Sequence, residues 1–239
     1  MNVNIAYGIE GAKIARGITV IVDIYRAAST ATYALGQKAK YVIPVATKEE
    51  ALTLKKQNPD YLLMGEEHGF RINEFNFGNS PHELMQADLE NKILVQRTSK
   101  GTQGLVNATK ADELIFGSFP TISAIAAYIK RKSPQEITIV AMDGEDSEDE
   151  VFAIYLKSQL MQDPVNPEIT KTYLMNHRVS VRFLDPNQPE FPKEDINYCL
   201  DIDRFNFVCL VKKIGNQLRI VKISYKDEIG LERYAQRKT

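Results

Sequence analysis

The sequence predicts an α/β fold in which helices cover both faces of a mostly parallel or mixed sheet, as in a layered α/β/α sandwich. Short apolar runs rich in β-branched residues alternate with longer amphipathic segments from residue 18 to about residue 160, and this alternation is typical of parallel βαβ units. Near the end, two more apolar runs flank Gly215-Asn216, which indicates a turn between antiparallel strands.

The first unit begins with the apolar run 18–22, which ends at Asp23. Ser29 and Thr30 then open an alanine-rich helix that extends to Leu35. The same alternation predicts strands at 41–45, 61–64, 93–96, 114–116 and 137–141, and helices at 48–57, 121–130 and 148–161.

The pattern changes after Asp163, where prolines at 164, 167, 186, 189 and 192 interrupt a region of weak periodicity. We expect loops and short helices that cover the core in this region. The runs 207–212 and 218–225 form the expected C-terminal β-hairpin, and residues 236–239 are expected to fray.

The 239 residues can bury one large core or two small lobes, and length alone does not decide between them. We expect a single unit over residues 1–239. Two intertwined lobes are the alternative, in which residues 1–160 carry the functional motifs and residues 163–239 complete the fold.

Composition narrows the class of protein. The chain is 44% hydrophobic and 26% charged, with a formal net charge of −1 and no dense Lys/Arg tract, so we expect no nucleic-acid partner. No segment approaches the ~18 consecutive apolar residues of a membrane span, and the start lacks a targeting pattern; we therefore expect no membrane partner and a cytoplasmic location. Cys199 and Cys209 lie in apolar runs and are expected to be buried thiols. A homodimer is the expected assembly, because enzymes of this size are commonly homo-oligomeric.

Polar residues that directly follow an apolar strand are the first candidates for function, because ligands of open α/β sheets bind beyond the carboxyl ends of the strands. The first such cluster contains Asp23, Arg26, Ser29 and Thr30. Asp23 could hold a divalent cation, and the hydroxyls and N–H groups at the helix start could hold a phosphate. On local sequence alone the simpler interpretation is favoured, in which a hydroxyl caps the helix and Arg26 pairs with Asp23.

Two further clusters lie in polar loops. Residues 65–69 (Gly-Glu-Glu-His-Gly) and 75–81 (Phe-Asn-Phe-Gly-Asn-Ser-Pro) form a long loop suited to face a substrate, although Asn79-Ser80-Pro81 is also typical of an ordinary helix start. Thr98-Ser99-Lys100-Gly101-Thr102 offers hydroxyls, a cation and a flexible backbone to an anion, and Ser118 holds a similar position after the strand 114–116.

The fourth cluster, 143–150, has six carboxylates in eight residues. One or two of them would suffice to bind Mg²⁺, which takes carboxylate oxygens and retains waters. For most of them, a solvated helix N-terminus that the helix dipole favours is the simpler interpretation.

Several other chemistries lack their motifs. The chain has no Gly-x-x-x-x-Gly-Lys-Ser/Thr loop, no Gly-x-Ser-x-Gly elbow and no His-Glu-x-x-His. An aspartyl-phosphate phosphatase would have a second Asp two residues after the first, and that position is Tyr25. This difference argues against Asp23 as a covalent nucleophile.

Taken in order, the clusters resemble the 2-phosphosulfolactate phosphatase (ComB-type) family. The matching segments are Asp23-Ile-Tyr-Arg26-Ala-Ala-Ser29-Thr30, Gly65-Glu66, Phe75–Pro81, Thr98–Thr102, Gly117-Ser118-Phe119 and Glu148-Asp149, with a weaker similarity at 195–204. Each motif alone is weak, and six in order are a strong signal.

The resemblance implies a ComB-like fold and Mg²⁺-dependent hydrolysis of a phosphate ester on a sulfonated lactate. This step belongs to coenzyme M biosynthesis in methanogens and to sulfolactate formation in some bacteria. It implies metal binding by Asp23, Glu148 and Asp149. It implies binding of the substrate or its phosphate by Arg26, Ser29, Thr30, Asn79, Ser80, Thr98, Gly101 and Thr102, to which we add Lys100 and Ser118 from their positions after strands. Asp23 and Arg26 are the expected catalytic residues, with water attacking phosphorus directly.

Three departures from the family pattern keep alternatives open. Glu67 stands where an Arg is expected, Asn76 where an Asp is expected, and Lys100 within an expected Thr-Thr-Asn-Gly-Thr. Glu67 would repel a polyanionic ester unless it is paired, and Lys100 is a candidate partner. The alternatives are a phosphatase of a different small acidic phosphoester and a non-catalytic, anion-binding relic.

Overall fold

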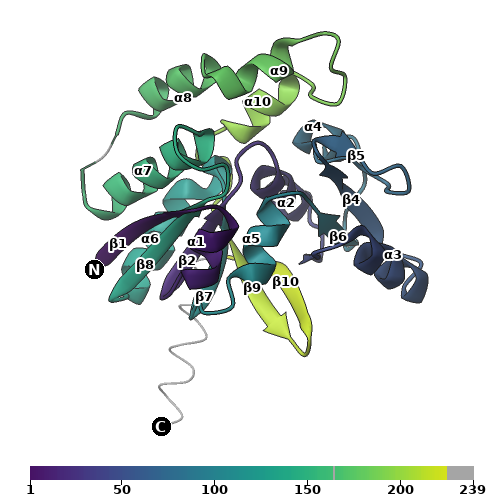
Figure 1. The fold of residues 1–239 in the computed structure, drawn as a ribbon, viewed down its shortest axis with the longest axis horizontal. Coiled ribbons are helices and arrows are strands. Elements are labelled where there is room, and N and C mark those ends of the chain that lie inside the picture. Colours follow the sequence, from purple (N-terminus) through teal and green to yellow (C-terminus); the bar gives the residue numbers. More distant parts are fainter. Residues whose placement is uncertain (164, 225–239) are drawn as a thin grey trace.

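A computed structural model describes residues 1–163 and 165–224 of the chain. In this part, ten strands form one mixed sheet with the order β1-β8-β2-β7-β9-β10-β3-β6-β4-β5 (Figure 1). The strands are β1 (Asn2–Tyr7), β2 (Ile18–Val22), β3 (Tyr41–Pro44), β4 (Leu62–Glu67), β5 (Phe70–Arg71), β6 (Ile93–Arg97), β7 (Glu113–Gly117), β8 (Glu136–Ala141), β9 (Val208–Ile214) and β10 (Gln217–Ile223).

Helices cover both faces of the sheet because successive residues of a strand point to opposite sides. Val20 and Val22 of β2 pack with the helices α6 (Ile122–Lys132) and α7 (Glu148–Leu160). Ile21 packs on the other face with α2 (Ala27–Gly36) and α5 (Gly101–Asn107), beside α1 (Gly8–Ile14). In the second half of the sheet, α3 (Lys48–Gln57) contacts β4 and β6. The predicted layered α/β/α architecture is confirmed.

The hairpin β9–β10 joins two groups of parallel strands. β1, β8, β2 and β7 run parallel to one another, as do β3, β6 and β4, and three antiparallel pairings in the middle separate β2 from β6. In a flat sheet the carboxyl ends of these two strands would lie at opposite edges. Neighbouring strands are rotated by about 20–25°, so five steps accumulate roughly 100–125°. The segments that follow the two strands therefore meet. The side-chain amide of Gln96, in β6, donates to the carbonyl of Ala27, the first residue of α2, at 3.0 Å.

The segment after α7 lies over the carboxyl ends of the first strand group as a layer of short helices (Figure 1). Its elements are α8 (Pro167–Met175), the 3₁₀ helix η2 (Arg178–Ser180), α9 (Val181–Leu184) and α10 (Glu194–Cys199). Phe183, Phe191 and Ile196 join this layer to the core on the α6–α7 face. The prediction of loops and short helices that cover the core is confirmed.

Most predicted elements agree with the structure within a few residues, and three of the longer elements were not predicted. These are β1, α1 and α5, the last of which begins at Gly101 where we expected a flexible loop. The predicted hairpin forms, although Tyr225 and residues 236–239 lie outside the described residues. The remaining short helices are α4 (Pro81–Leu84) and the 3₁₀ helix η1 (Phe119–Thr121). Within the described chain, no helix is both long and apolar enough to cross a membrane.

Candidate active site

Two segments bring the three predicted metal-binding carboxylates to one site. Asp23 directly follows β2, and Glu148 and Asp149 form the first turn of α7. Asp149 joins the loop after β2 to the loop after β8. One of its carboxylate oxygens accepts from the N–H of Ile24 at 2.7 Å, and the other accepts from the N–H of Asp143 at 3.0 Å. Asp23 accepts from the N–H of Ala27 at 3.0 Å.

Burial makes these carboxylates electrostatically costly. Glu148 and Asp149 are fully buried, and Asp23 is 7% exposed. Burial, followed by the charge of Asp23, raises the pKa of Glu148 to about 7. Burial and the charges of Glu148 and Asp23 raise the pKa of Asp149 well above its usual range. The pKa of Asp23 is also raised, again chiefly by burial.

The donor chemistry of this cluster fits a hard divalent cation. Both carboxylate oxygens of Glu148 are buried and have no hydrogen-bond partner in the described residues, and oxygens of this kind are the preferred ligands of Mg²⁺. The carboxylates are close enough to raise one another's pKa. In the described residues, however, no three His, Cys, Asp or Glu side chains already converge on one point where a metal ion could sit.

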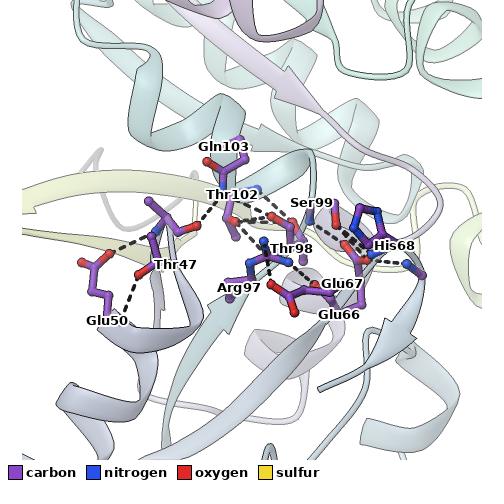
Figure 2. A network of polar contacts seen from close by, with 12 residues as sticks. Thr47, Glu50, Glu66, Glu67, His68, Arg97, Thr98, Ser99, Thr102 and Gln103 are labelled. Atoms are coloured by element: carbon purple, nitrogen blue, oxygen red, sulfur yellow. Dashed lines mark hydrogen bonds and ion pairs between the residues drawn. The ribbon is translucent and has the colours of Figure 1, made fainter. Parts of the chain in front are cut away.

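The predicted anion cradle at 98–102 is the N-terminus of α5, and the protein itself satisfies many of its donors. The N–H of Thr98 donates to the hydroxyl of Thr102 at 2.9 Å, and the N–H of Thr102 donates to the hydroxyl of Thr98 at 3.0 Å. The N–H of Ser99 donates to the carboxylate of Glu66 at 2.6 Å (Figure 2). The expected flexible loop is therefore an ordered helix start that holds a carboxylate of the chain.

Glu66 is a site residue whose role was not predicted. It is 7% exposed, and its carboxylate also accepts from the hydroxyl of Ser99 at 3.1 Å and from the N–H of Gly69 at 2.5 Å. Its negative charge raises the pKa of Asp23. The position of Glu66 after a strand, within Gly65-Glu66, was the only available signal in the sequence.

Gly101 is required by close packing. A Cβ atom at this position would lie 2.7 Å from the Asp23 carboxylate and 2.7 Å from the Ala27 side chain. Its backbone N–H lowers the pKa of Asp23, against the effect of burial. Gly101 thus lies in close contact with Asp23, and its role in binding a substrate anion stays a prediction.

The suggested pairing of Glu67 with Lys100 is wrong. Glu67 pairs with Arg97 at 3.1 Å (Figure 2), and Lys100 pairs with Asp143. The physical reason lies in the strand pairing, because Gly65 of β4 lies beside Arg97 of β6 in the parallel register and brings Glu67 close to Arg97. The side chain of Lys100 is 57% exposed at the edge of the carboxylate cluster.

Arg26 is bound to the C-terminal segment instead of to Asp23, the partner that the simpler sequence interpretation suggested. Its Nη1 donates to Asp195 at 2.8 Å and to the carbonyl of Glu190 at 2.7 Å. The guanidinium carbon lies 4.8 Å from the ring centroid of Phe191. Arg26 is therefore fixed in place and its charge is compensated.

Asp195 is a second residue whose role the sequence did not show. In the stretch 195–204, the sequence leaves open whether Asp195, Asp201, Asp203 and Arg204 complete the site or lie on the surface, and it favours the surface. For Asp195 the surface interpretation is wrong, because this residue is fully buried. Besides Arg26, it accepts from the hydroxyl of Ser80 at 2.8 Å and from the N–H of His82 at 2.9 Å. Asp203 is exposed and accepts from the N–H of Ser123 at 2.8 Å.

The remaining predicted site residues are buried, and most bond within the protein. Ser29 and Thr30 donate to backbone carbonyls of their own segment at 3.0 and 2.9 Å, and Ser118 bonds to Thr32 at 2.8 Å. Ser80 caps α4, whereas the side-chain oxygen of Asn79 is buried and has no hydrogen-bond partner within 1–163 and 165–224. Arg26, Asn79 and Ser80 line a cleft of about 600 Å³ together with Arg71, His82, Glu83 and Pro192. A larger groove of about 950 Å³, between α5 and the β9–β10 hairpin, contains none of the predicted site residues.

Comparison with known proteins agrees with these motifs. The family model described as 2-phosphosulpholactate phosphatase matches residues 4–213. A probable 2-phosphosulfolactate phosphatase of Bacillus subtilis is 31% identical over 209 residues, which cover 86% of this chain and 92% of that protein. Proteins with the same name from Caldanaerobacter subterraneus and Thermoplasma acidophilum are 31% and 28% identical over 81% and 80% of this chain, and over 87% and 84% of their own lengths. The chain belongs to the 2-phosphosulpholactate phosphatase family.

Proposed function

We propose that this protein is a Mg²⁺-dependent phosphatase that hydrolyses 2-phosphosulfolactate to sulfolactate and phosphate. The observation that carries the proposal is the buried cluster of Asp23, Glu148 and Asp149, in which both oxygens of Glu148 lack a hydrogen-bond partner among the residues that the structure describes. The family match supports the reaction class and the substrate.

The charge of the site supports a requirement for a cation. Asp23, Glu66, Glu148 and Asp149 are all buried, and the nearby charge of Lys100 is paired with Asp143. The combined negative charge of these carboxylates would repel a phosphate ester that carries further acidic groups. Glu148, Asp23 and Asp149 are the residues that would hold Mg²⁺. When bound, the ion would polarise the phosphoryl oxygens and lower the pKa of a bound water.

We infer direct attack by water, because the hydroxyls that follow β2 and the cysteine thiols, all within the described residues, are poorly suited to act as nucleophiles. The hydroxyls of Ser29 and Thr30 are buried and donate to backbone carbonyls, and burial raises the pKa of both cysteine thiols. The water oxygen would form the new bond to phosphorus, the bond from phosphorus to the ester oxygen would break, and the leaving alkoxide would take up the proton that the attacking water gives up. Asp23 would orient the water, while Lys100 would offset charge on the phosphoryl group.

The departures from the family pattern have structural roles that leave the carboxylates intact. The charge of Glu67 is compensated by Arg97, which removes much of the objection to a polyanionic substrate. The side-chain oxygen of Asn76 accepts from the N–H of Leu63 at 2.9 Å. These contacts favour the family reaction over a different phosphoester or a non-catalytic relic.

We further propose a cytoplasmic homodimer that acts in sulfolactate formation or coenzyme M biosynthesis. The two free, buried cysteines are compatible with a reducing compartment. Sedimentation of the purified protein would test the dimer, and a monomeric mass across micromolar concentrations would contradict it.

Phosphate release from a panel of esters tests the proposed reaction. The panel contains racemic 2-phosphosulfolactate, 2-phospholactate and phosphoglycolate, each with Mg²⁺ and then with excess chelator. We expect turnover of the sulfonated ester that the chelator abolishes. Turnover of only the other esters would contradict the substrate, and no turnover of any ester would favour the non-catalytic relic.

A further inference from the structure

A phosphoester with a second acidic group needs a cation to bind that group, and the predicted cations of the site are already paired. Arg26 is held by Asp195 at 2.8 Å, and Lys100 is held by Asp143. Two other arginines near the loops of the site are also paired with acids, Arg71 with Glu83 and Arg97 with Glu67, both at 3.1 Å. The cation for a second acidic group must therefore come from elsewhere.

Arg182, in α9 of the C-terminal segment, meets this requirement. Among the contacts of residues 1–163 and 165–224, its guanidinium has neither an ion pair nor a hydrogen bond, and its Nε is buried without a partner. A buried donor without an acceptor is costly, so such a donor calls for a ligand or another explanation. An anion bound at the guanidinium would supply the missing acceptor.

The aromatic rings beneath Arg182 fix its position relative to Arg26. Its guanidinium carbon lies 5.0 Å from the ring centroid of Phe191 and 5.5 Å from that of Phe183. The guanidinium carbon of Arg26, close in sequence to Asp23, lies 4.8 and 5.6 Å from the same two centroids. Each of these contacts lies within the roughly 6 Å range of a cation–π interaction. Because both guanidinium carbons lie about 5 Å from the Phe191 centroid, the two carbons are at most roughly 10 Å apart.

The electrostatics of the site agree with this geometry. The positive charge of Arg182 lowers the pKa of Glu148, against the larger effect of burial. The same charge lowers the pKa of Tyr25, which precedes Arg26. Arg182 is thus close enough to Glu148 and Tyr25 for its charge to act on both groups.

We propose that Arg182 is a specificity-determining residue that binds the second acidic group, a carboxylate or a sulfonate, of the phosphoester. The inference rests on the proposed phosphatase function. A guanidinium presents paired N–H donors that match two oxygens of either group, and the aromatic rings hold it in a fixed orientation. The C-terminal segment would then select the substrate, while the strand ends carry the phosphoryl chemistry.

The test compares Arg182→Gln and Arg182→Lys with the wild type on four matched esters. 2-Phosphosulfolactate carries both acidic groups, and 2-phospholactate carries only the carboxylate. 1-Sulfopropan-2-yl phosphate carries only the sulfonate, and isopropyl phosphate carries neither. For R182Q we expect KM to rise about ten- to hundredfold for esters that carry the recognised group, with kcat little changed, because a charge-assisted hydrogen bond is lost. R182K should lose less, and isopropyl phosphate should be unaffected.

Arg178→Gln is the matched control, because Arg178 is an exposed cation of the same segment. It removes one positive charge near the site without the aromatic stacking. If R182Q raises KM only for the esters that carry a carboxylate, Arg182 binds the carboxylate. If R182Q raises KM only for the esters that carry a sulfonate, Arg182 binds the sulfonate. Equal losses in R178Q and R182Q, or a KM for every ester unchanged by R182Q, would overturn the proposal.

Direct binding separates this inference from the proposed function. Sulfolactate carries both acidic groups and no phosphate, so its calorimetric titration into the wild type, R182Q and R178Q does not depend on turnover. If the wild type hydrolyses no ester, the proposed function fails, yet sulfolactate binding that only R182Q loses would still support Arg182. Equal binding by the wild type and R182Q, or no binding by the wild type, would overturn the role of Arg182.

Discussion

Asp195 and Arg26 form a buried ion pair that joins the C-terminal segment to the loop after β2. The distance between the carboxylate and Nη1 is 2.8 Å, and the two side chains are 0% and 4% exposed. Because Asp195 also accepts from Ser80 and from the N–H of His82, one carboxylate connects three segments that are far apart in the sequence. The segment after α7 therefore helps to build the site.

Asp195→Ala should destabilise the protein by about 3–5 kcal/mol, because it leaves the buried guanidinium of Arg26 without its counter-charge. Chemical denaturation with a fluorescence or circular dichroism signal measures the free energy of unfolding. Glu194→Ala, one residue away in α10 and with a partly exposed side chain, is the control and should change it little. Equal effects of the two substitutions would contradict the importance of the pair.

Glu148→Gln should stabilise the metal-free protein at pH 8. Burial raises the pKa of this carboxyl to about 7, so at pH 8 it is mostly ionised inside the protein, where no described residue is hydrogen-bonded to its oxygens. Removing that charge should raise the free energy of unfolding by on the order of 2 kcal/mol. It should also abolish the increase in melting temperature that Mg²⁺ gives the wild type.

The control is Glu145→Gln in the exposed part of the same acidic loop, which should keep the response to Mg²⁺. Thermal melting of both variants, with chelator and then with Mg²⁺, makes the comparison. An E148Q protein that is less stable than the wild type in chelator would argue that Glu148 has a partner in solution.

Gly101→Ala should impair both stability and activity. Its Cβ would lie 2.7 Å from the Asp23 carboxylate and 3.0 Å from the ring of Phe116, so either α5 or Asp23 must shift. Overpacking of this kind costs about 1–3 kcal/mol. Denaturation and the rate of phosphate release check the two effects, and a variant with wild-type values of both would show that α5 can move away from Asp23 without loss.

The cysteine thiols should be unreactive in the native protein. Burial raises the pKa of Cys209 to about 12, and burial also raises the pKa of Cys199 well above its usual range. At pH 7 to 9, a thiol reagent should label neither cysteine until denaturant unfolds the protein. Rapid native labelling would show that the C-terminal segment or the sheet opens easily.

The raised pKa of Cys209 also has a consequence for stability. The stabilisation that the buried, protonated thiol contributes is fully present below the pKa of the unfolded thiol, at about 8.5. It is lost as pH rises toward and through the folded pKa of about 12, because the thiol of the unfolded chain ionises first. Between pH 8 and 10.5, the free energy of unfolding should therefore fall less for Cys209→Ala than for the wild type. Parallel pH profiles of the two proteins would contradict this.

Local patterns predicted the fold well because most elements carry their own signals. The helix 48–57 has a Thr47 cap and acidic residues in its first turn, and its predicted bounds are those of α3. α5 was missed because it begins with Gly101 and contains Gly104, which are poor helix formers. The structure needs glycine at 104 because a Cβ there would lie 2.6 Å from the sulfur of Met142 and 2.7 Å from Ile21.

The candidate site was predicted less completely, because its contacts join residues that are distant in the sequence. Asp23, Glu148 and Asp149 could be proposed from their places after strands and at a helix start. The contact of Glu66 with Ser99 and the partners of Asp195 join separate elements, so no local pattern reveals them. Register also decided the pairing of Glu67 with Arg97, since it depends on which residues of β4 and β6 lie side by side.

The most direct test of the account is the initial rate of phosphate release from 2-phosphosulfolactate with Mg²⁺, measured for the wild type and for Asp23→Asn. Asn keeps the size of the side chain and can still accept from the N–H of Ala27, so circular dichroism should show an intact fold. We predict rapid release by the wild type and no measurable release by D23N. Equal rates in the two proteins would remove Asp23 from the mechanism and contradict the assignment of the buried carboxylates as the reaction centre.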